Sequence, residues 1–373
     1  MLYHLLAPLA RDGGFFNLFT YITFRAAGAA VTAILMALFV GPLVIRHLRA
    51  HKVGQVVRAE GPATHEGKRG TPTMGGLIIL LATVVPTLLW AQLTNRYVWV
   101  CVIATAWMGT IGLVDDYLKV VSGKSRGLVA RYKLVGQVTF GVALGSYLIL
   151  APLAANLPPT STTLPFFKYV LVVLPTVAYV AFVTFVITGV TNAVNLTDGL
   201  DGLATGLTVI AAGAFAIFAY LFGRVDASEY LRVYYLRGAG ELSIFCTALV
   251  GAALGFLWFN AHPAEVFMGD TGSLAIGGAL GTVAILLKSE LLLLLVGGVF
   301  AAETLSVIIQ ASVFRWHRGR RGREYAEQHR VFRMAPLHHH FEKLGWAEPK
   351  VVVRFYIVGI LCALLALSTL KIR

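Results

Sequence analysis

Apolar residues run through this chain in long stretches that short, strongly polar loops separate. A helix needs about 20 mostly apolar residues to cross a bilayer, and ten stretches reach or approach that length. We expect membrane spans at residues 19–46, 74–94, 97–115, 133–153, 168–190, 202–222, 241–260, 272–288, 291–314 and 352–370. The pattern predicts an all-α polytopic membrane protein in which residues 1–373 form a single domain.

The composition supports this prediction. Of the 373 residues, 57% are hydrophobic and 13% are charged, whereas soluble domains carry about 25% charged residues. The three cysteines lie in apolar stretches, without the spacing of a metal site or a disulfide framework. A soluble enzyme, a disordered chain and a secreted disulfide-rich protein are therefore excluded.

The basic residues indicate how the chain is oriented. Twenty of the 31 lysines and arginines fall in the loops after the first, third and ninth predicted spans. Because loops rich in Lys and Arg stay in the cytoplasm, we expect both termini on the periplasmic side. Membrane anchoring of this kind accounts for the net charge of +13, so no nucleic-acid partner is expected.

Aspartates gather at the predicted cytoplasmic ends of the spans. Five of the seven lie there: Asp115, Asp116, Asp198, Asp201 and Asp270. Orientation does not require this arrangement, since acidic residues contribute little to it. We therefore predict an active site on the cytoplasmic face.

The adjacent residues Asp115 and Asp116 close the third predicted span. Asp115 and Lys119 make an i,i+4 pair, which alone would be an ordinary interfacial helix end. Hard cations prefer carboxylate oxygens, so the functional interpretation is a Mg²⁺ or proton-transfer site. Lys133, which opens the next span, would bring a cation back to the same place.

A second polar segment, residues 192–202, leads into the sixth predicted span. Asp198 and Asp201 are three residues apart, which predicts that they share a helix face. A helix cap needs one residue, such as Thr197 or Asp198, but this segment also supplies Asn195. The surplus of polar groups indicates a binding site.

Residues 68–76 and 260–273 enter the second and eighth predicted spans from the same side. Ordinary alternatives are Pro72 in a first helical turn and Asp270 as a helix cap. The N-terminal ends of spans two, six and eight would all face the cytosol, and helix N-termini bind phosphate. Carboxylates among them would repel a bare anion, so this combination predicts a Mg²⁺–diphosphate ligand.

Residues 336–342 read Pro-Leu-His-His-His-Phe-Glu in the long basic loop after the ninth span. Consecutive histidines cannot all face one metal, so we expect His338, His339 and His340 to contact phosphate oxygens rather than zinc. Glu303 and Gln310 lie seven residues apart within the ninth span, which places them on one helix face. Ionisable residues in a span are usually functional.

From about residue 44 to the C-terminus, these motifs resemble the polyprenyl-phosphate N-acetylhexosamine-1-phosphate transferase superfamily, and within it the MraY family of phospho-N-acetylmuramoyl-pentapeptide transferases. The aspartate pair at 115–116, Asn-Leu-Thr-Asp-Gly-Leu-Asp-Gly and Phe-Met-Gly-Asp are shared with sibling sugar-phosphate transferases. Pro-Leu-His-His-His-Phe-Glu, His-Pro-Ala-Glu-Val and Gly-Thr-Pro-Thr-Met-Gly-Gly are more particular to the MraY family.

The resemblance implies transfer of phospho-MurNAc-pentapeptide from UDP-MurNAc-pentapeptide to undecaprenyl phosphate. This reaction yields lipid I and UMP in the first membrane step of peptidoglycan synthesis. The resemblance also implies a Mg²⁺ cofactor, the bacterial cytoplasmic (inner) membrane and a homodimer, which the small-residue pairs Gly141/Gly145 and Gly251/Gly255 permit. Two alternatives remain open: a sibling transferase that uses UDP-N-acetylglucosamine, and a secondary transporter, which ten spans and Glu303 would suit.

Carried over by position, the resemblance implies that Asp270 binds Mg²⁺ directly, with Asn195 and Asp198 close to the metal or the diphosphate. The expected catalytic residues are Asp115, Asp116, Asp198, Asp270, Lys133, His338, His339 and His340. The expected substrate-binding residues are Lys68, Thr73, Asn192, Asn195, Gly199, Leu200, Asp201, Asn260, Phe267, Glu303 and Gln310, of which Lys68, Thr73, Gly199, Leu200, Asp201, Asn260 and Phe267 line the uridine end.

Two chemical routes follow for Asp115. It either removes a residual proton from the lipid phosphate in a single displacement, or attacks the diphosphate itself and forms an aspartyl phosphate. A phosphate monoester has a second pKa near ~6, so the acceptor is already largely dianionic at neutral pH. Because this nucleophile is adequate, single displacement is favoured.

Overall fold

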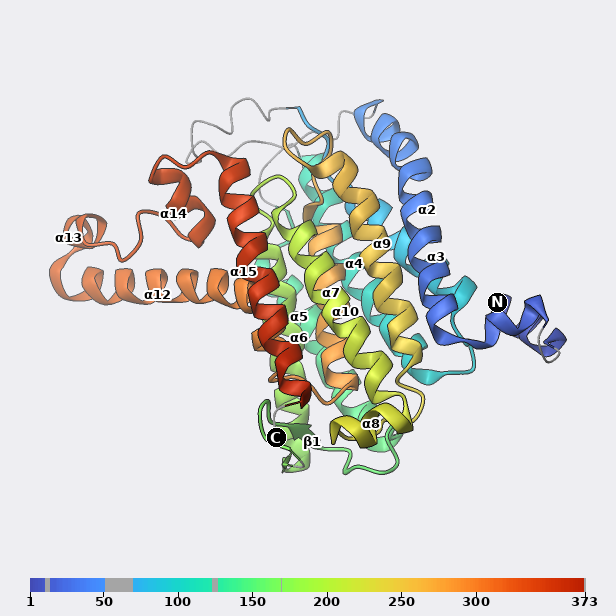
Figure 1. Ribbon diagram of the computed structural model, residues 1–373. Coiled ribbons are helices and arrows are strands. Elements are labelled where there is room, and N and C mark those ends of the chain that lie inside the picture. The colour runs from blue at the N-terminus through green and yellow to red at the C-terminus, as the bar shows by residue number, and fades with distance from the viewer. Residues whose placement is uncertain (11–13, 51–69, 123–126, 169, 372–373) are drawn as a thin grey trace.

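Long apolar helices dominate the structure, a computed structural model that describes residues 1–10, 14–50, 70–122, 127–168 and 170–371. The long helices are α2 (Ile22–Ala50), α3 (Gly76–Trp90), α4 (Arg96–Ser122), α5 (Ala130–Leu150), α6 (Thr176–Thr197), α7 (Leu203–Phe222), α9 (Glu241–Asn260), α10 (Gly269–Leu286), α12 (Gly298–Arg321) and α15 (Glu348–Ser368). Most of them stand side by side in one bundle, and α12 projects sideways from it (Figure 1).

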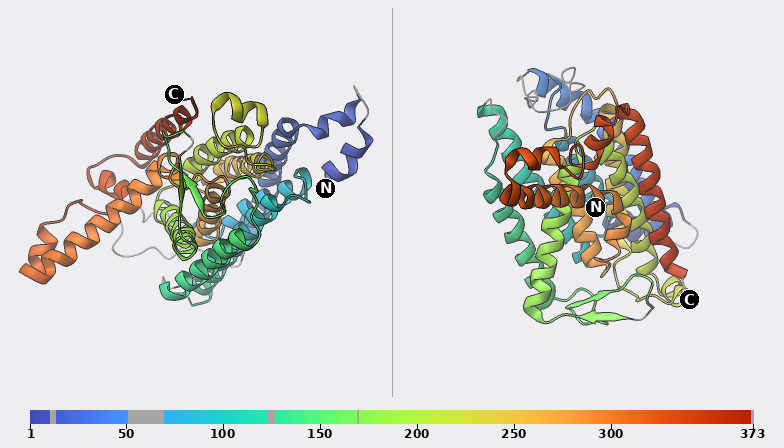
Figure 2. Two further views of the ribbon diagram at one scale, coloured as in Figure 1. Left: turned by 90° about the horizontal axis from the view of Figure 1, so that it is seen from below. Right: turned by 90° about the vertical axis from the view of Figure 1, so that its left-hand side faces the viewer.

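Short elements fill the connections. They are α1 (Leu2–Leu6), η1 (Ala7–Leu9), η2 (Phe15–Thr20), α8 (Val225–Leu231), α11 (Leu293–Val296), α13 (Arg323–Gln328), α14 (Leu337–Lys343) and η4 (Thr369–Lys371). Strands β1 (Ser161–Thr163) and β2 (Leu171–Val173) form an antiparallel hairpin in which Ser161 pairs with Val173. Figure 2 shows this hairpin across one end of the bundle.

Nine helices in the described part of the chain are long and apolar enough to cross a membrane. This confirms a polytopic, mainly helical membrane protein. The predicted span at 74–94 was too long: α3 covers 15 residues, about 22 Å at 1.5 Å per residue, against a hydrocarbon core of roughly 30 Å. Its start is fixed by pairing with another loop, because the amides of Gly75 and Gly76 donate to the carbonyls of Phe267 and Met268.

The larger differences from the expected boundaries fall at three other spans. The span expected at 168–190 begins later, because residues 171–173 pair in the hairpin and α6 starts at Thr176. Helix α4 continues to Ser122, so Asp115 and Asp116 lie within the helix rather than at its end. Helix α12 begins at Gly298 and ends at Arg321, beyond the expected 291–314.

Helix α10 forms the centre of the bundle, where it packs against α3, α4, α6 and α7. Its glycines permit close approach, since small residues bring helix backbones together. A Cβ on Gly76 of α3 would lie 2.1 Å from the Gly272 amide nitrogen, and one on Gly112 of α4 would lie 2.2 Å from the Asp270 carbonyl oxygen. These contacts bring the start of α3 and the C-terminal half of α4 to the start of α10.

The small-residue pairs considered for a dimer interface are used inside the chain instead. Gly141 and Gly145 of α5 face α6, and Gly251 and Gly255 of α9 face α2. Their close packing partners include the Thr184 and Ala30 backbones. These four glycines therefore pack helices of one chain together, and the homodimer stays a prediction that they do not support.

Candidate active site

A cluster of three carboxylates lies where α4 meets the start of α10. Oxygens of Asp115, Asp116 and Asp270 fall within 4.8 Å of one another. Asp115 and Asp116 are almost completely buried, whereas Asp270 is partly exposed. Three negative charges this close repel one another strongly, so the arrangement requires cations.

Two lysines supply positive charge to the cluster. The Lys119 ammonium lies 2.5 Å from Asp115 Oδ2 and 3.2 Å from Asp270 Oδ2. Lys133, from the start of α5, lies 3.0 Å from Asp115 Oδ2 and also contacts Asp270. The structure thus brings Lys133 to the aspartates as the sequence predicted.

The Asp116 carboxylate accepts hydrogen bonds from the N-terminus of α10. Its Oδ1 accepts the Asp270 amide at 3.2 Å, and its Oδ2 accepts the Thr271 amide at 2.9 Å and the Thr271 hydroxyl at 2.7 Å. A carboxylate at a helix N-terminus satisfies free amides and interacts favourably with the helix dipole. The cap of α10 is therefore Asp116 of α4, not the Asp270 side chain considered from the sequence.

Asn195 and Asp198 approach Asp270 from the end of α6. The Asn195 amide nitrogen donates to Asp270 Oδ1 at 3.0 Å and to the Ser273 hydroxyl at 2.8 Å. Burial, followed by the negative charges of Asp270 and Asp116, raises the pKa of Asp198 to about 8. Asp198 therefore lies in a strongly negative region that a bound cation would relieve.

Asp198 and Asp201 do not share a helix face, so this expectation was wrong. Helix α6 ends at Thr197 and α7 begins at Leu203, with a turn between them. Gly202 in this turn has a φ of +79°, a left-handed conformation that glycine adopts readily. The two carboxylates therefore lie in a turn and not on one helix.

Asp201 belongs to a second polar group. Its Oδ2 lies 3.1 Å from His262 Nδ1 and accepts the Ala264 amide at 3.1 Å. Its own amide donates to Glu348 Oε1 at 2.7 Å. The neighbouring Asn260 accepts the Gly202 amide at 3.2 Å. Asp201 and Asn260 thus hold the 198–202 turn against the loop that follows α9.

The histidine run lies in α14, and the three histidines contact different neighbours. His338 is buried, its amide donates to Glu303 Oε1 at 3.2 Å, and its Nδ1 lies 3.2 Å from the same oxygen. His339 Nδ1 lies 2.7 Å from Glu342, and His340 Nδ1 accepts the Arg333 amide at 3.0 Å. The three imidazoles therefore point to different places.

Glu303 and Gln310 of α12 both contact the segment that runs from Phe332 to His338, which agrees with their expected place on one helix face. Glu303 contacts His338, and the Gln310 side-chain oxygen accepts the Phe332 amide at 3.0 Å. Both residues therefore attach α12 to the loop that carries the histidines. The His338 ring also reaches the 198–202 turn, since a Cβ on Gly199 would lie 2.2 Å from its Nε2.

The remaining expected residues are distributed around these groups. Thr73 lies beside the carboxylate cluster, since a Cβ on Gly269 would come within 2.9 Å of its hydroxyl. Leu200 is buried in the turn, and Phe267 pairs through its amide with the Pro72 carbonyl. Asn192 donates to Gln137 of α5 at 2.8 Å. Lys68 lies outside the described residues.

Sequence reasoning left several contributors out of the expected site. Lys119 was considered as an ion-pair partner of Asp115, but it also reaches Asp270. Thr271 follows Asp270 directly, yet its contact with Asp116 spans 155 positions. Glu348 gave no local signal, because its partner Asp201 is 147 residues away. His262 stands in the quoted His-Pro-Ala-Glu-Val motif, which was the available cue.

Comparisons with known proteins agree with these motifs. The model of glycosyl transferase family 4 matches residues 98–288, and the phospho-N-acetylmuramoyl-pentapeptide-transferase signature 1 matches residues 68–80. Relatives named phospho-N-acetylmuramoyl-pentapeptide-transferase include those of Gemmatimonas aurantiaca, 64% identical, and of Desulfosudis oleivorans and a Geobacter species, each 52% identical. Each match covers 100% of both chains.

Proposed function

The chain belongs to the phospho-N-acetylmuramoyl-pentapeptide-transferase family, and from this premise we propose that it transfers phospho-MurNAc-pentapeptide from UDP-MurNAc-pentapeptide to undecaprenyl phosphate. The products are lipid I and UMP, and the enzyme works in the bacterial cytoplasmic membrane. The observation that carries the proposal is the cluster of Asp115, Asp116 and Asp270 at one end of the central helix. The names of the relatives favour this reaction over the sibling transferase and the transporter.

We propose Mg²⁺ as the cofactor, with Asp270, Asn195 and Asp198 as the residues that hold it. Carboxylate oxygens of Asp115, Asp116 and Asp270 lie within 4.8 Å of one another, and such oxygens suit a hard divalent cation. Asn195 presents its amide nitrogen to Asp270 in the structure, so its side-chain amide would turn its oxygen toward a bound metal. Asp115 Oδ2 is buried and lies 2.5 Å from the Lys119 ammonium and 3.0 Å from the Lys133 ammonium. When bound, Mg²⁺ neutralises charge on the diphosphate of the donor.

The chain's own residues then position the reactants. Lys119 and Lys133 place positive charge beside the phosphate that is transferred, which stabilises the charge that develops there. Asp115 accepts a residual proton from the lipid phosphate, which attacks in line. Asp116 keeps the α10 N-terminus, and with it Asp270, in place.

The turn at 198–202 and its neighbours are proposed to bind the UDP end of the donor. Asp201 and Asn260 are fixed by hydrogen bonds from the surrounding loops, and Phe267 offers a ring on which a base stacks. His338, His339 and His340 border the same region through the contact of His338 with Gly199. The predicted orientation, with this site in the cytoplasm and both termini in the periplasm, belongs to the proposal, as does a homodimer.

The test is UMP release by purified protein with undecaprenyl phosphate and Mg²⁺. UDP-MurNAc-pentapeptide and UDP-N-acetylglucosamine are supplied separately, and Asp270→Asn serves as the impaired control. We expect release with the first donor only, abolished by EDTA. Release with the second donor alone would transfer the chain to the sibling activity, and no release from folded protein would refute a transferase.

A further inference from the structure

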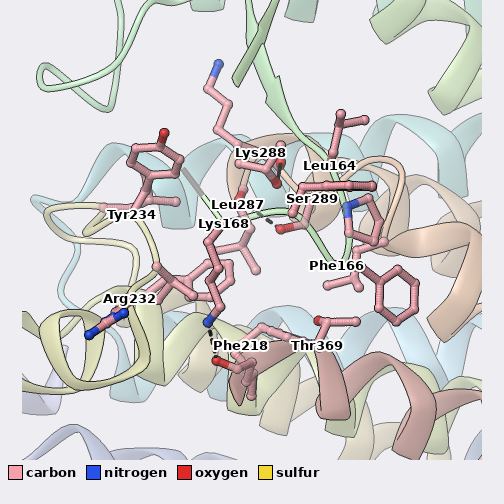
Figure 3. A pocket seen from close by; sticks show the side chains of 18 of the residues that line it. Leu164, Phe166, Lys168, Phe218, Arg232, Tyr234, Leu287, Lys288, Ser289 and Thr369 are labelled. Atoms are coloured by element: carbon pink, nitrogen blue, oxygen red, sulfur yellow. Dashed lines mark hydrogen bonds between the residues drawn. The ribbon is translucent and has the colours of Figure 1, made fainter. Parts of the chain in front are cut away.

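A pocket lies at the end of the bundle opposite the carboxylate cluster. It has a cavity volume of about 70 Å³ and lies between the ends of the long helices and the hairpin loop. Phe218 and Phe222 of α7 form one wall, and Thr369 and Leu370 of η4 form another. Figure 3 shows the Lys168 ammonium directed toward this C-terminal wall.

Two cations line one side of this pocket, and a third lies near them. Lys168 and Arg232 line it, and Lys371 is close enough to act electrostatically on Lys168. Burial, followed by the like charges of Lys371 and Arg232, lowers the pKa of the Lys168 ammonium. Among the described residues that line the pocket there is no carboxylate. The repulsion between these cations would be relieved by an anion from outside the chain.

Lys168 does not behave as an ordinary membrane anchor. Such lysines extend their ammonium groups into water, whereas Lys168 is partly buried and donates to the carbonyls of Leu231 and Leu370. An ammonium has three donors, so one is left for a ligand. The fourth cation of this region, Lys288, is turned away from Lys168 and contacts Pro159 and Tyr179 (Figure 3).

Arg232 is held in an unusual conformation. It ends α8 with a φ of +55°, a left-handed backbone that few residues other than glycine adopt. Its guanidinium is exposed, and no described side chain pairs with it in a hydrogen bond or an ion pair. A strained residue of this kind, which leaves a planar anion-binding group free, suits phosphate recognition.

We propose that this pocket binds the phosphate group of an anionic phospholipid. The cations Lys168 and Arg232 in the pocket lining match a phosphate, and the apolar wall of Phe166 and Phe167, whose side chains are exposed, matches the chains that follow it. A free inorganic anion would gain nothing from that wall. The pocket lies at the ends of membrane-spanning helices, which is the level of lipid headgroups. This site is independent of the proposed transferase activity.

The test compares lipid probes in nanodiscs that contain the full-length protein in phosphatidylcholine. Trace amounts of spin-labelled phosphatidylglycerol or spin-labelled phosphatidylcholine are added, and the motionally restricted fraction is measured. We expect the protein to prefer the phosphatidylglycerol probe. Lys168→Gln and Arg232→Gln should each weaken that preference about fivefold, and the double variant should abolish it.

Arg237→Gln is the matched control, because it removes one exposed charge from the same loop outside the pocket lining. It should keep the preference. Retention of the preference by the double variant would overturn the site. Displacement of the labelled lipid by millimolar inorganic phosphate would overturn the lipid as the ligand. Because Arg232 is exposed, Arg232→Gln should fold and tests the proposal even if Lys168→Gln does not fold. Unchanged UMP release by each variant shows that its fold is intact.

Discussion

The carboxylate of Asp116 accepts both the backbone amide and the hydroxyl of Thr271, at 2.9 and 2.7 Å. Residues 155 positions apart thereby join the C-terminal part of α4 to the first turn of α10. The contact satisfies amides that would otherwise lack partners at the start of a buried helix. It also fixes the backbone from which Asp270 projects toward Lys119 and Lys133.

Asp116→Asn should destabilise the protein even though its shape is nearly unchanged. One carboxylate oxygen becomes an NH₂ group that faces an N–H donor, which leaves buried groups unsatisfied at a cost of about 1–3 kcal/mol. The free energy of unfolding, measured by denaturant titration in detergent, should fall by this amount together with UMP release. Thr271→Val removes the hydroxyl but keeps the amide contact, so it should lose less. Equal losses in the two variants would contradict a capping role for Asp116.

Gly199→Ala should disturb the histidine segment. The added Cβ would lie 2.2 Å from His338 Nε2, so the buried ring or the 198–202 turn must move. Displacements of about 1 Å near a reacting group lower rates by up to about 100-fold, and we expect UMP release to fall by about 10- to 100-fold. Gly189→Ala of α6 is the control, because its Cβ meets nothing within 4 Å. Similar activity in both variants would show that His338 need not be where the structure has it.

Asp115→Asn should lose most turnover while binding of the UDP-sugar survives. Asp115 contacts Lys119, Lys133 and the Leu128 amide, whereas Asp201, which is proposed to bind the UDP end, contacts His262 and Glu348. Single displacement further predicts that no UMP appears when undecaprenyl phosphate is omitted. The measurements are steady-state UMP release, UDP-sugar affinity by calorimetry and a search for phosphorylated protein without acceptor. Near-normal turnover would refute a chemical role, and a phosphorylated Asp115 would establish the two-step route.

The membrane fold could be predicted from the sequence because apolar stretches report directly on span length. The same pattern failed at α3 and α6, where local pairing overrides hydropathy. Gly75 pairs with Phe267 across the loops, and the hairpin takes residues 171–173 away from the expected helix. Such contacts join residues that are far apart in the chain, so the pattern of apolar residues within one stretch cannot predict them.

The sequence was sufficient to predict which residues lie together at one end of the bundle, but not how each side chain is paired. Topology alone placed Asp115 and Asp270 together, and the structure agrees. Their spacing could not predict that Asp198 and Asp201 lie in a turn rather than on one helix face, because this depends on the backbone around Gly202. Glu348 stayed hidden for a related reason: its contact with Asp201 exists only once α15 packs against α7.

Asp270→Asn should raise the Mg²⁺ concentration needed for half-maximal UMP release by at least about tenfold, which corresponds to about 1.4 kcal/mol. The substitution removes a charged oxygen from the cluster and leaves its neighbours in place. Ser273→Ala is the control: it deletes a partner of Asn195 at 2.8 Å without removing a carboxylate. An unchanged Mg²⁺ requirement in Asp270→Asn would exclude this residue as a metal ligand.

Glu290 should make stability depend on pH in a direction opposite to that of a salt-bridged carboxylate. Burial raises its pKa from 4.5 to about 7, and Thr162 donates to one of its oxygens at 2.5 Å while the other lacks a partner. Between these values the folded protein binds more protons than the unfolded chain, so the free energy of unfolding falls as the pH rises. The change from pH 4.5 to 7 is on the order of 3 kcal/mol. Glu290→Gln should flatten this dependence in denaturant titrations at pH 5.0 and 7.5, whereas Glu229→Gln, at an exposed position on α8, should leave it unchanged. The same slope in Glu290→Gln and in the unmodified protein would assign the pH dependence to other groups.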